Sequence, residues 1–295
     1  MRVAMIGLGD IARKAYLPVL GTRPDVQLAF VTRNAATLDE LGVAWRVDRL
    51  HADLDEALAQ GVDAAFVHAA TEVHPTIVTR LVEAGVPTLV DKPIADTLEA
   101  CESVVDLAET HGVSLMVGFN RRYAPAQAEA ATLKAPFVLM QKNRTGHADA
   151  VRRTVFDDFI HVVDSLRFLA PGATDARVSG RVAGDLLQHV MLHLAGPGLD
   201  AVGIMNRDSG ANEEVLEVMG AGAKRRIVNL AEVTDYAGGE HVTRRGDWAT
   251  VARQRGFEAM IEAFLAAVRE DRRLSALDAL ETHRLCERVV AELSA

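Results

Sequence analysis

Three separate stretches of this 295-residue sequence hold residues whose types and spacing could carry chemistry. The first is close to the amino terminus, where an apolar run leads into Gly7-x-Gly9-x-x-Ala12. Gly7 permits a tight turn, Gly9 lets a pyrophosphate approach the backbone, and Ala12 is small enough for a helix to pack closely on a strand. The phosphates would meet the free N–H groups of Asp10 and Ile11, where the next helix starts. We therefore expect a dinucleotide site here, with a merely structural glycine turn as the alternative.

The end of the second apolar run indicates which dinucleotide would bind. The sequence there is Phe30-Val31-Thr32-Arg33-Asn34, without the acidic residue that accepts hydrogen bonds from the 2′-hydroxyl of NAD. A guanidinium attracts a 2′-phosphate and stacks on adenine. Thr32 and Arg33 therefore favour NADP, although NAD is possible and Arg33 could be only a solvated turn residue.

The second stretch is Val90-Asp91-Lys92-Pro93, at the end of another expected strand. Parallel sheets place ligands at the carboxyl ends of their strands. Pro93 restricts the backbone of Lys92 to an extended conformation, which helps to fix the direction of the ammonium group. A lysine at this place can polarise a substrate oxygen, whereas Lys-Pro in isolation is typical of a surface turn.

The third stretch is an expected helix at about Phe156–Ala170. At 100° per residue Asp157, His161, Asp164 and Phe168 share one face, with Asp158 and Ser165 beside it. Asp157 and His161 are four residues apart and can touch, so the aspartate can orient the imidazole as a general base. The alternative is a capping aspartate at 157 or 158 and a structural histidine.

The elements that position these residues follow from apolar periodicity. Before residue 119 we expect five strands at Arg2–Ile6, Val26–Thr32, Ala64–Ala69, Thr88–Asp91 and Ser114–Gly118. Helical segments between them, such as Ala52–Gln60, Pro75–Ala84 and Leu98–Thr110, are followed by Gly61, Gly85 and Gly112 at left-handed caps. This alternation predicts an α/β fold, a doubly wound parallel Rossmann sheet in a domain spanning 1–119.

The rhythm changes in the second half. After the Phe156–Ala170 helix we expect strands at Ala176–Ala183, Leu186–Ala195, Ala201–Arg207, Glu214–Met219, Arg225–Glu232 and His241–Arg245. Short connections between them predict a large, open and mainly antiparallel sheet. Two closing helices, at about Arg255–Glu270 and Ala276–Leu293, complete an α+β domain spanning 120–295.

Composition excludes several classes of protein. The 32 basic against 41 acidic side chains give a net charge of −9 without a long basic run, so we expect neither nucleic acid nor a membrane as partner. The 49% apolar content is typical of a globular chain. Cys101 and Cys286 form no metal-ligand spacing, and we expect no metal site and two reduced thiols in a cytoplasmic protein.

Together these residues resemble the Gfo/Idh/MocA oxidoreductases along essentially the whole chain, and within them the branch of MviM-type virulence factors. The motifs that carry the resemblance are Gly7-Leu8-Gly9, Phe66-Val67-His68, Asp91-Lys92-Pro93, Gly118–Tyr123, Asp157-x-x-x-His161-x-x-Asp164 and Gln254-Arg255-Gly256-Phe257. The chain departs from the family pattern in having Asp91 for the usual glutamate, Ala12 for the third glycine and Phe159 for a glycine after the motif aspartate.

The resemblance implies hydride transfer between a nicotinamide and a secondary alcohol or its carbonyl, often on a sugar or cyclitol. It implies Lys92, Asp157 and His161 as catalytic residues, and adds Thr71, His74, Asp91 and Lys92 to the cofactor cleft. It also implies that the second sheet mediates a homodimer or homotetramer. We thus expect an NADP-dependent oxidoreductase acting on CH–OH groups of a small polar substrate.

Basic side chains near the expected site favour a sugar-like or anionic substrate. The candidates for substrate contact are Arg121, Arg122, Tyr123, Lys142, Arg144, Asp158 and Arg255. Half of the basic groups could instead be solvated or paired with acids. A regulatory protein of the same fold that senses NADP without chemistry is the alternative function. Glycoside cleavage through transient oxidation is a third, and nothing in the sequence favours it.

Overall fold

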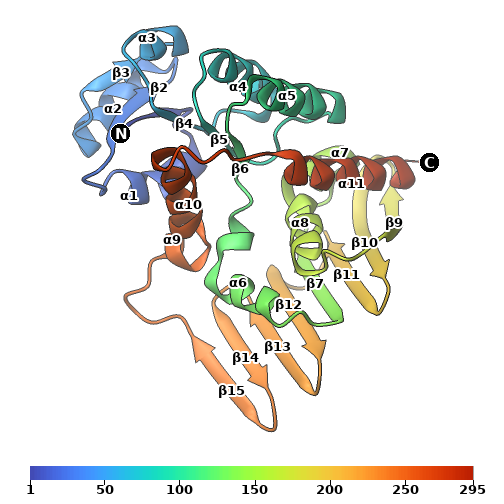
Figure 1. Cartoon of the computed structure of the whole chain (residues 1–295). Helices are drawn as coiled ribbons and strands as arrows, with labels where there is room; N and C mark the ends of the chain where they lie inside the picture. Colours follow the sequence, from blue (N-terminus) through green and yellow to red (C-terminus); the bar gives the residue numbers. More distant parts are fainter. Residues whose placement is uncertain (295) are drawn as a thin grey trace. The chain divides into compact units, whose positions relative to one another are not determined.

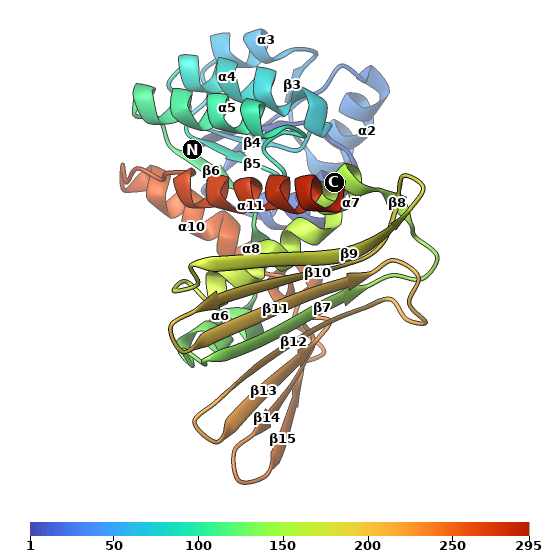
Figure 2. The same cartoon turned by 90° about the vertical axis from the view of Figure 1, so that its right-hand side faces the viewer.

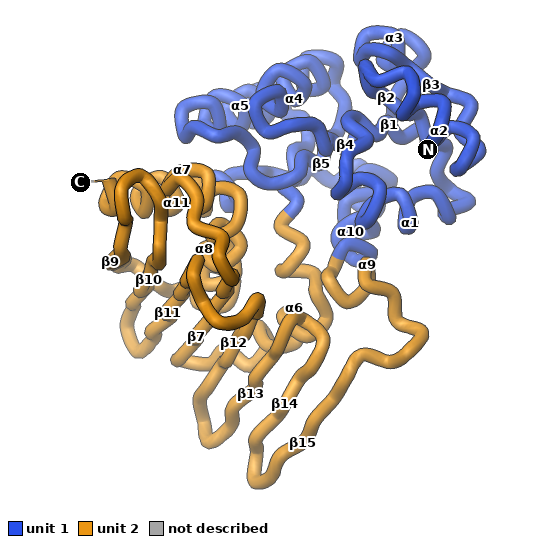
Figure 3. The backbone as a smooth tube through the Cα atoms, turned by 180° about the vertical axis from the view of Figure 1, so that it is seen from behind, with its two compact units in different colours: residues 1–118, 257–280 blue, residues 119–256, 281–295 orange. Residues whose placement is uncertain are grey.

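The protein, described here from a computed structural model for residues 1–294, divides into two compact units (Figure 3). Unit 1 comprises residues 1–118 and 257–280, and unit 2 comprises residues 119–256 and the chain from 281. The chain first passes from unit 1 to unit 2 between residues 118 and 119, next to the expected boundary at 119/120. The return of 257–280 to unit 1 differs from the expected single second domain. Its physical reason is aromatic packing, because Phe257 and Phe264 have ring centroids 5.3 Å from Tyr16 and 5.1 Å from Phe66.

Unit 1 is built on a six-stranded parallel sheet, which confirms the Rossmann prediction. In spatial order the strands are β3 (Arg49–His51), β2 (Gln27–Val31), β1 (Arg2–Ile6), β4 (Ala64–Val67), β5 (Thr88–Val90) and β6 (Leu115–Val117). The strand order reverses between β1 and β4, where doubly wound sheets bind their ligands. The short strand β3 was not among those expected.

Helices cover both faces of this sheet. Figure 1 shows α4 (His74–Glu83) and α5 (Leu98–His111) side by side on one face, and α1 (Leu17–Leu20) with α10 (Phe257–Arg269) on the other. The remaining helices of the unit are the π-helical η1 (Ala12–Tyr16), α2 (Ala35–Trp45), α3 (Leu54–Ala59) and η2 (Thr71–Val73). The predicted caps Gly61, Gly85 and Gly112 adopt positive φ angles of 83°, 71° and 66°.

Unit 2 is built on a nine-stranded sheet in the order β15-β14-β13-β12-β7-β11-β10-β8, with β9 paired to β10 (Figure 2). The strands are β7 (Phe137–Asn143), β8 (Asp149–Ala150), β9 (Asp175–Ala183), β10 (Leu186–Gly196), β11 (Leu199–Asn206), β12 (Glu213–Gly220), β13 (Ala223–Val228), β14 (Glu232–Tyr236) and β15 (Glu240–Arg244). Only the β7–β11 pair is parallel among these strands, so the prediction of a mainly antiparallel sheet is confirmed.

Three details of this sheet differ from the expectation, the first being that the short strand β8 was not predicted. The strand expected at 225–232 is two strands, β13 and β14, because Asn229 and Leu230 form a turn with φ angles of 52° and 56°. Strand β7 was not predicted, although it lies in the middle of the sheet between β12 and β11.

The helices of unit 2 are η3 (Asn120–Tyr123), α6 (Pro125–Thr132), α7 (Val151–Thr154), the π-helical η4 (Val155–Phe159), α8 (Ile160–Leu169), α9 (Val251–Gln254) and most of α11 (Leu277–Leu293). Helix α8 packs directly on the sheet, since a Cβ at Gly203 of β11 would lie 2.5 Å from Val162. None of the described helices is long and apolar enough to cross a membrane.

Candidate active site

A cavity of about 550 Å³ opens in unit 1 at the carboxyl ends of β1, β2 and β4. It is lined, among others, by Gly7, Gly9, Thr32, Arg33, Asp53 and His68. Four of these six were predicted as cofactor residues from the sequence. Asp53 was missed because it comes from the loop after the unpredicted strand β3, and His68 was given no role of its own.

The glycine turn fits a dinucleotide. Gly7 has a φ of 83°, and a Cβ there would lie 2.5 Å from the backbone nitrogen of Ala69, so the chain passes too closely for any side chain. At Gly9 a Cβ would meet no protein atom within 4 Å, and the space beside this backbone belongs to the cavity. A diphosphate can therefore approach the backbone at Gly9, as the fingerprint requires.

The first helix starts at Asp10 and continues through η1. Ala12 is fully buried, as its predicted packing role demands. Asp10 is exposed and pairs with Lys14 at 2.7 Å, and Ile11 is also exposed. Neither of these two side chains lines the cavity, so a contact with the phosphates would come from their backbone N–H groups.

The end of β2 carries a cation and no carboxylate. Arg33 is exposed at the cavity, and the side chain of Asn34 caps α2 by accepting from the N–H of Thr37 at 3.1 Å. The carboxylate of Asp53 accepts from the N–H of Glu56 at 2.9 Å, as the cap of α3. The acidic group in this cavity is therefore committed to a helix cap.

Two predicted cofactor residues lie behind the cavity rather than on its wall. His74 is buried, with Nδ1 3.0 Å from the carbonyl oxygen of Pro93 and Nε2 2.9 Å from that of Ala69. Thr71 begins η2, and the cavity is lined there by Ala70, Val73 and Thr76 instead. His74 thus ties the loop after β4 to the segment that carries Lys92.

Asp91 and Lys92 follow β5 directly. The Tyr16 hydroxyl donates to Oδ1 of Asp91 at 3.2 Å, and burial raises the pKa of Asp91 to about 6 against the opposing effect of Lys92. Lys92 is half-buried, and its bond to Pro93 is cis. The Tyr16 ring also lies 3.9 Å from that of His68, whose pKa burial lowers to about 3. His68 is therefore uncharged at neutral pH.

The helix that carries Asp157 and His161 is not the regular α-helix that we expected. Residues 155–159 form the π-helix η4, whose i→i+5 hydrogen bonds break the 100° spacing on which the shared face depended. Asp157 is exposed on this turn, 3.6 Å from Arg153, and His161 is half-buried on α8. Asp164 does not join them, since its side chain is buried.

Asp164 and Glu214 hold two of the arginines that were candidates for substrate contact. Arg122 donates to Asp164 from Nε at 3.0 Å and from Nη2 at 2.6 Å, and Thr282 adds a bond at 3.2 Å. Arg121, 5% exposed, makes two bonds of 2.7 Å to Glu214. These pairs position η3 and β12, and Tyr123 lies on the same turn.

Asp158 is the centre of a buried charged cluster. Arg207 donates to it at 2.6 Å, Arg144 lies at 3.4 Å, and Lys142 contacts it directly. Burial alone would raise the pKa of Asp158, but these cations outweigh it and lower it to about 2. Burial and the neighbouring Arg121 lower the pKa of Lys142 to about 7. No sequence pattern indicated a role for Arg207, because strand pairing alone brings it to this cluster.

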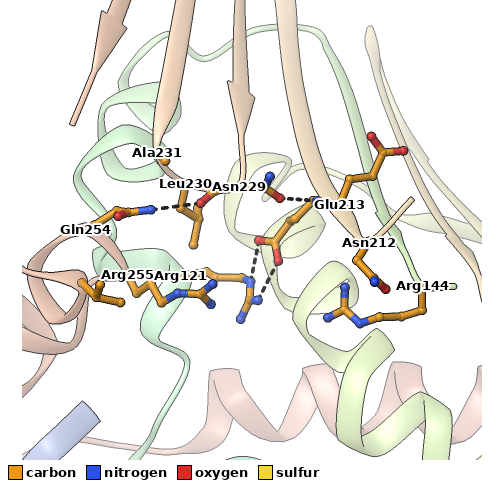
Figure 4. Close-up of a pocket in the computed structure, with 11 residues that line it drawn as sticks. Arg121, Arg144, Asn212, Glu213, Asn229, Leu230, Ala231, Gln254 and Arg255 are labelled. Atoms are coloured by element: carbon orange, nitrogen blue, oxygen red, sulfur yellow. Dashed lines mark hydrogen bonds and ion pairs between the residues drawn. The ribbon is translucent and has the colours of Figure 1, made fainter. Parts of the chain in front are cut away.

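A second pocket, of about 470 Å³, lies in unit 2 over the ends of β12 and β13 (Figure 4). Its lining includes three of the substrate candidates: Arg121, Arg144 and Arg255. The polar groups beside them, Asn212, Glu214, Asn229 and Gln254, were not predicted from the sequence. Gln254 donates to the carbonyl oxygen of Asn229 at 3.1 Å and so fixes the turn between β13 and β14.

Comparison with known proteins decides the family. The model of an oxidoreductase family with an NAD-binding Rossmann fold, Gfo/Idh/MocA, matches residues 1–119, and that of a YceM-like C-terminal domain matches residues 122–236. YceM from Salmonella typhimurium, whose name classes it as an oxidoreductase, is 33% identical over 91% of this chain and 89% of its own. The chain belongs to the Gfo/Idh/MocA family of oxidoreductases.

Two solved structures superpose closely on the chain. A Gfo/Idh/MocA oxidoreductase from Vibrio cholerae has a TM-score of 0.93 at 30% identity, covering all of both chains. A dehydrogenase named MviM from Clostridium difficile has a TM-score of 0.92 at 29% identity over 99% of each. A myo-inositol dehydrogenase, Hyg17 from Streptomyces leeuwenhoekii, is 33% identical over 80% of this chain and 63% of its own.

Proposed function

We propose that this Gfo/Idh/MocA protein is an NADP-dependent oxidoreductase that moves a hydride between the nicotinamide and a secondary alcohol, or its carbonyl, on a small polar substrate. The unit 1 cavity carries this proposal, because it combines the glycine turn with Arg33 and lacks an acid at the end of β2. The presence of Lys92, Asp157 and His161 at the family's motif positions supports chemistry rather than cofactor sensing alone.

Each motif residue has a chemical part in the oxidation direction. His161, as the neutral imidazole, accepts the hydroxyl proton of the substrate, and Asp157 orients the ring and stabilises the imidazolium that forms. The ammonium of Lys92 stabilises the substrate oxygen as negative charge develops on it. The nicotinamide, when bound, supplies the hydride acceptor. Arg33 holds the 2′-phosphate, and Gly7 and Gly9 admit the diphosphate.

Replacing Lys92 tests the chemical part of the proposal. Lys92→Met should abolish turnover of NADP(H) with a panel of myo-inositol, keto sugars and keto acids, while NADPH still binds. Lys134→Met removes an exposed charge and is the matched control. Retained turnover in Lys92→Met would remove this residue from the mechanism. NADPH binding without turnover of any panel compound by the unsubstituted protein would favour the sensing function instead.

We further propose that the sheet of unit 2 joins two or four copies of the chain. Figure 2 shows its helices on one face and none of the described helices on the other. Met191 of β10 is 41% exposed between the buried Val190 and Leu192, so it lies on the uncovered face. Light scattering after gel filtration should give a dimer or tetramer. We assign the protein to the cytoplasm, where its buried Cys101 and Cys286 remain reduced.

A further inference from the structure

The pocket of unit 2 (Figure 4) has an excess of cationic side chains on and beneath its wall. Five cations contribute: Arg121, Arg144 and Arg255 on the wall, and Lys142 and Arg207 in the cluster around Asp158. Three carboxylates accompany them, those of Asp158, Glu213 and Glu214. With Lys142 protonated the excess is two positive charges, since five cations face three anions.

The arginines on the wall differ in how far they are already engaged. Arg121 is committed to Glu214 through two bonds of 2.7 Å. Arg144 donates from Nη1 to the carbonyl oxygen of Asn143 at 3.0 Å, and its contacts to Asp158, which Arg207 and Lys142 also occupy, are long at 3.4 Å. The guanidinium of Arg255 is exposed and close enough to Glu214 to help lower the pKa of that carboxyl, but it forms no side-chain hydrogen bond or ion pair with the residues 1–294 that the structure describes. Two guanidinium groups thus keep donors available at one pocket.

Guanidinium groups with spare donors bind planar or tetrahedral oxyanions bidentately. The amides of Asn212 and Gln254 line the same pocket and can donate to such a group as well. A neutral sugar hydroxyl would leave this cationic excess without a counter-charge, whereas an oxyanion would supply one through charge-assisted hydrogen bonds.

We propose that this pocket binds a carboxylate or phosphate group through Arg144 and Arg255, and that this group belongs to the substrate. The second half of the statement rests on the proposed function, whereas the binding itself does not. The substrate is then an anionic hydroxy or keto compound rather than a neutral cyclitol.

Lys142 offers a readout of occupancy. Its amine is faced by Asp158 of η4, by Arg121 of η3 and by Glu214 of β12, and shares Asp158 with Arg144 and Arg207. Because burial and Arg121 hold its pKa at about 7, part of the protein carries a neutral amine at pH 7.5. An arriving anion raises that pKa, so binding must take up protons from the buffer.

Calorimetry with inorganic phosphate and with succinate as probes tests this on the full-length protein. We expect one saturable site per chain, with the dissociation constant raised about tenfold or more by Arg255→Gln or Arg144→Gln. Arg284→Gln removes a surface charge that pairs with Glu281 on α11, and should leave binding unchanged. Buffers of different ionisation enthalpy should report proton uptake, and Lys142→Met should abolish it.

The outcomes separate the inference from the proposed function. No saturable binding of either probe, or equal weakening by Arg284→Gln, overturns the anion site. Binding of phosphate alone points to a phosphate ester, and binding of succinate alone to a carboxylic acid. Binding in Lys92→Met should persist, so failure of catalysis leaves the site standing. A probe that binds without competing with the substrate in turnover overturns its assignment to the substrate.

Discussion

Lys142→Met should change how the stability of the protein depends on pH. Lys142 is 2% exposed, and burial with the nearby Arg121 lowers its pKa from 10.5 to about 7 in the folded state. Between these two values the unfolded chain binds one proton more than the folded chain, so the free energy of unfolding rises with pH. The penalty for burying the ammonium is fully present below pH 7 and is relieved as the pH rises toward 10.5.

The magnitude follows from the linkage relation. One proton of difference is worth about 1.4 kcal/mol per pH unit, so the folded protein should gain about 2 kcal/mol between pH 7 and 9 from this group. Lys142→Met, a straight-chain replacement without the amine, lacks that gain. Urea unfolding at pH 7, 8 and 9, followed by circular dichroism, measures the difference between the two proteins. Lys134→Met, at an exposed lysine, should follow the unsubstituted protein. Parallel pH profiles for Lys142→Met and the unsubstituted protein would refute the assigned environment.

Four further substitutions test the unit 1 site. Arg33→Ser should weaken NADPH binding about tenfold or more and NADH binding much less, because only NADPH offers a 2′-phosphate; equal effects in fluorescence titrations would contradict this. Gly7→Ala should destabilise the protein by about 2 kcal/mol or more, given its φ of 83° and the 2.5 Å approach to Ala69. Gly9→Ala should preserve the urea midpoint of unfolding but weaken cofactor binding in titrations. A lowered midpoint with unchanged cofactor binding would contradict this. Because the folded carboxyl of Asp91 keeps its proton up to about pH 6, the unsubstituted protein should lose about 3 kcal/mol of stability at most as the pH rises from 4 to 6. Asp91→Asn should remove this loss. An unchanged pH profile of stability would count against the burial of Asp91.

Local sequence patterns were sufficient to predict the elements whose apolar runs and glycines determine the backbone conformation. The strands of unit 1 are apolar and buried, and glycine marks three helix ends with the expected positive φ angles. The turn between β13 and β14 has no such signal, because Asn229 and Leu230 adopt left-handed angles without a glycine. The backbone of Glu214 and the side chain of Asn229 hold that turn through a bond of 2.9 Å. A sequence reading therefore merges the two strands.

The sequence predicted which kinds of side chain the candidate site contains better than it predicted what each side chain contacts. Arg121, Arg122 and Lys142 were recognised as basic groups, but their carboxylate partners lie 93, 42 and 16 residues away in the chain. Sequence spacing cannot reveal such partners, because strand pairing and helix packing create them. The π-helix at 155–159 was also not predicted, because nothing in its composition distinguishes it from an α-helix.

That π-helical turn also has a consequence for comparing relatives. A turn of this kind accommodates one residue more than an α-helix, which rotates everything before it by about 100° against everything after it. Here it allows the consecutive acids Asp157 and Asp158 to serve different surroundings, one exposed and one inside the cationic cluster, upstream of His161. In a homologue that lacks one residue at this place, the acidic side chains before the deletion would point in a different direction around the helix axis. An alignment without a gap would then equate side chains whose directions differ by about 100° around the helix axis.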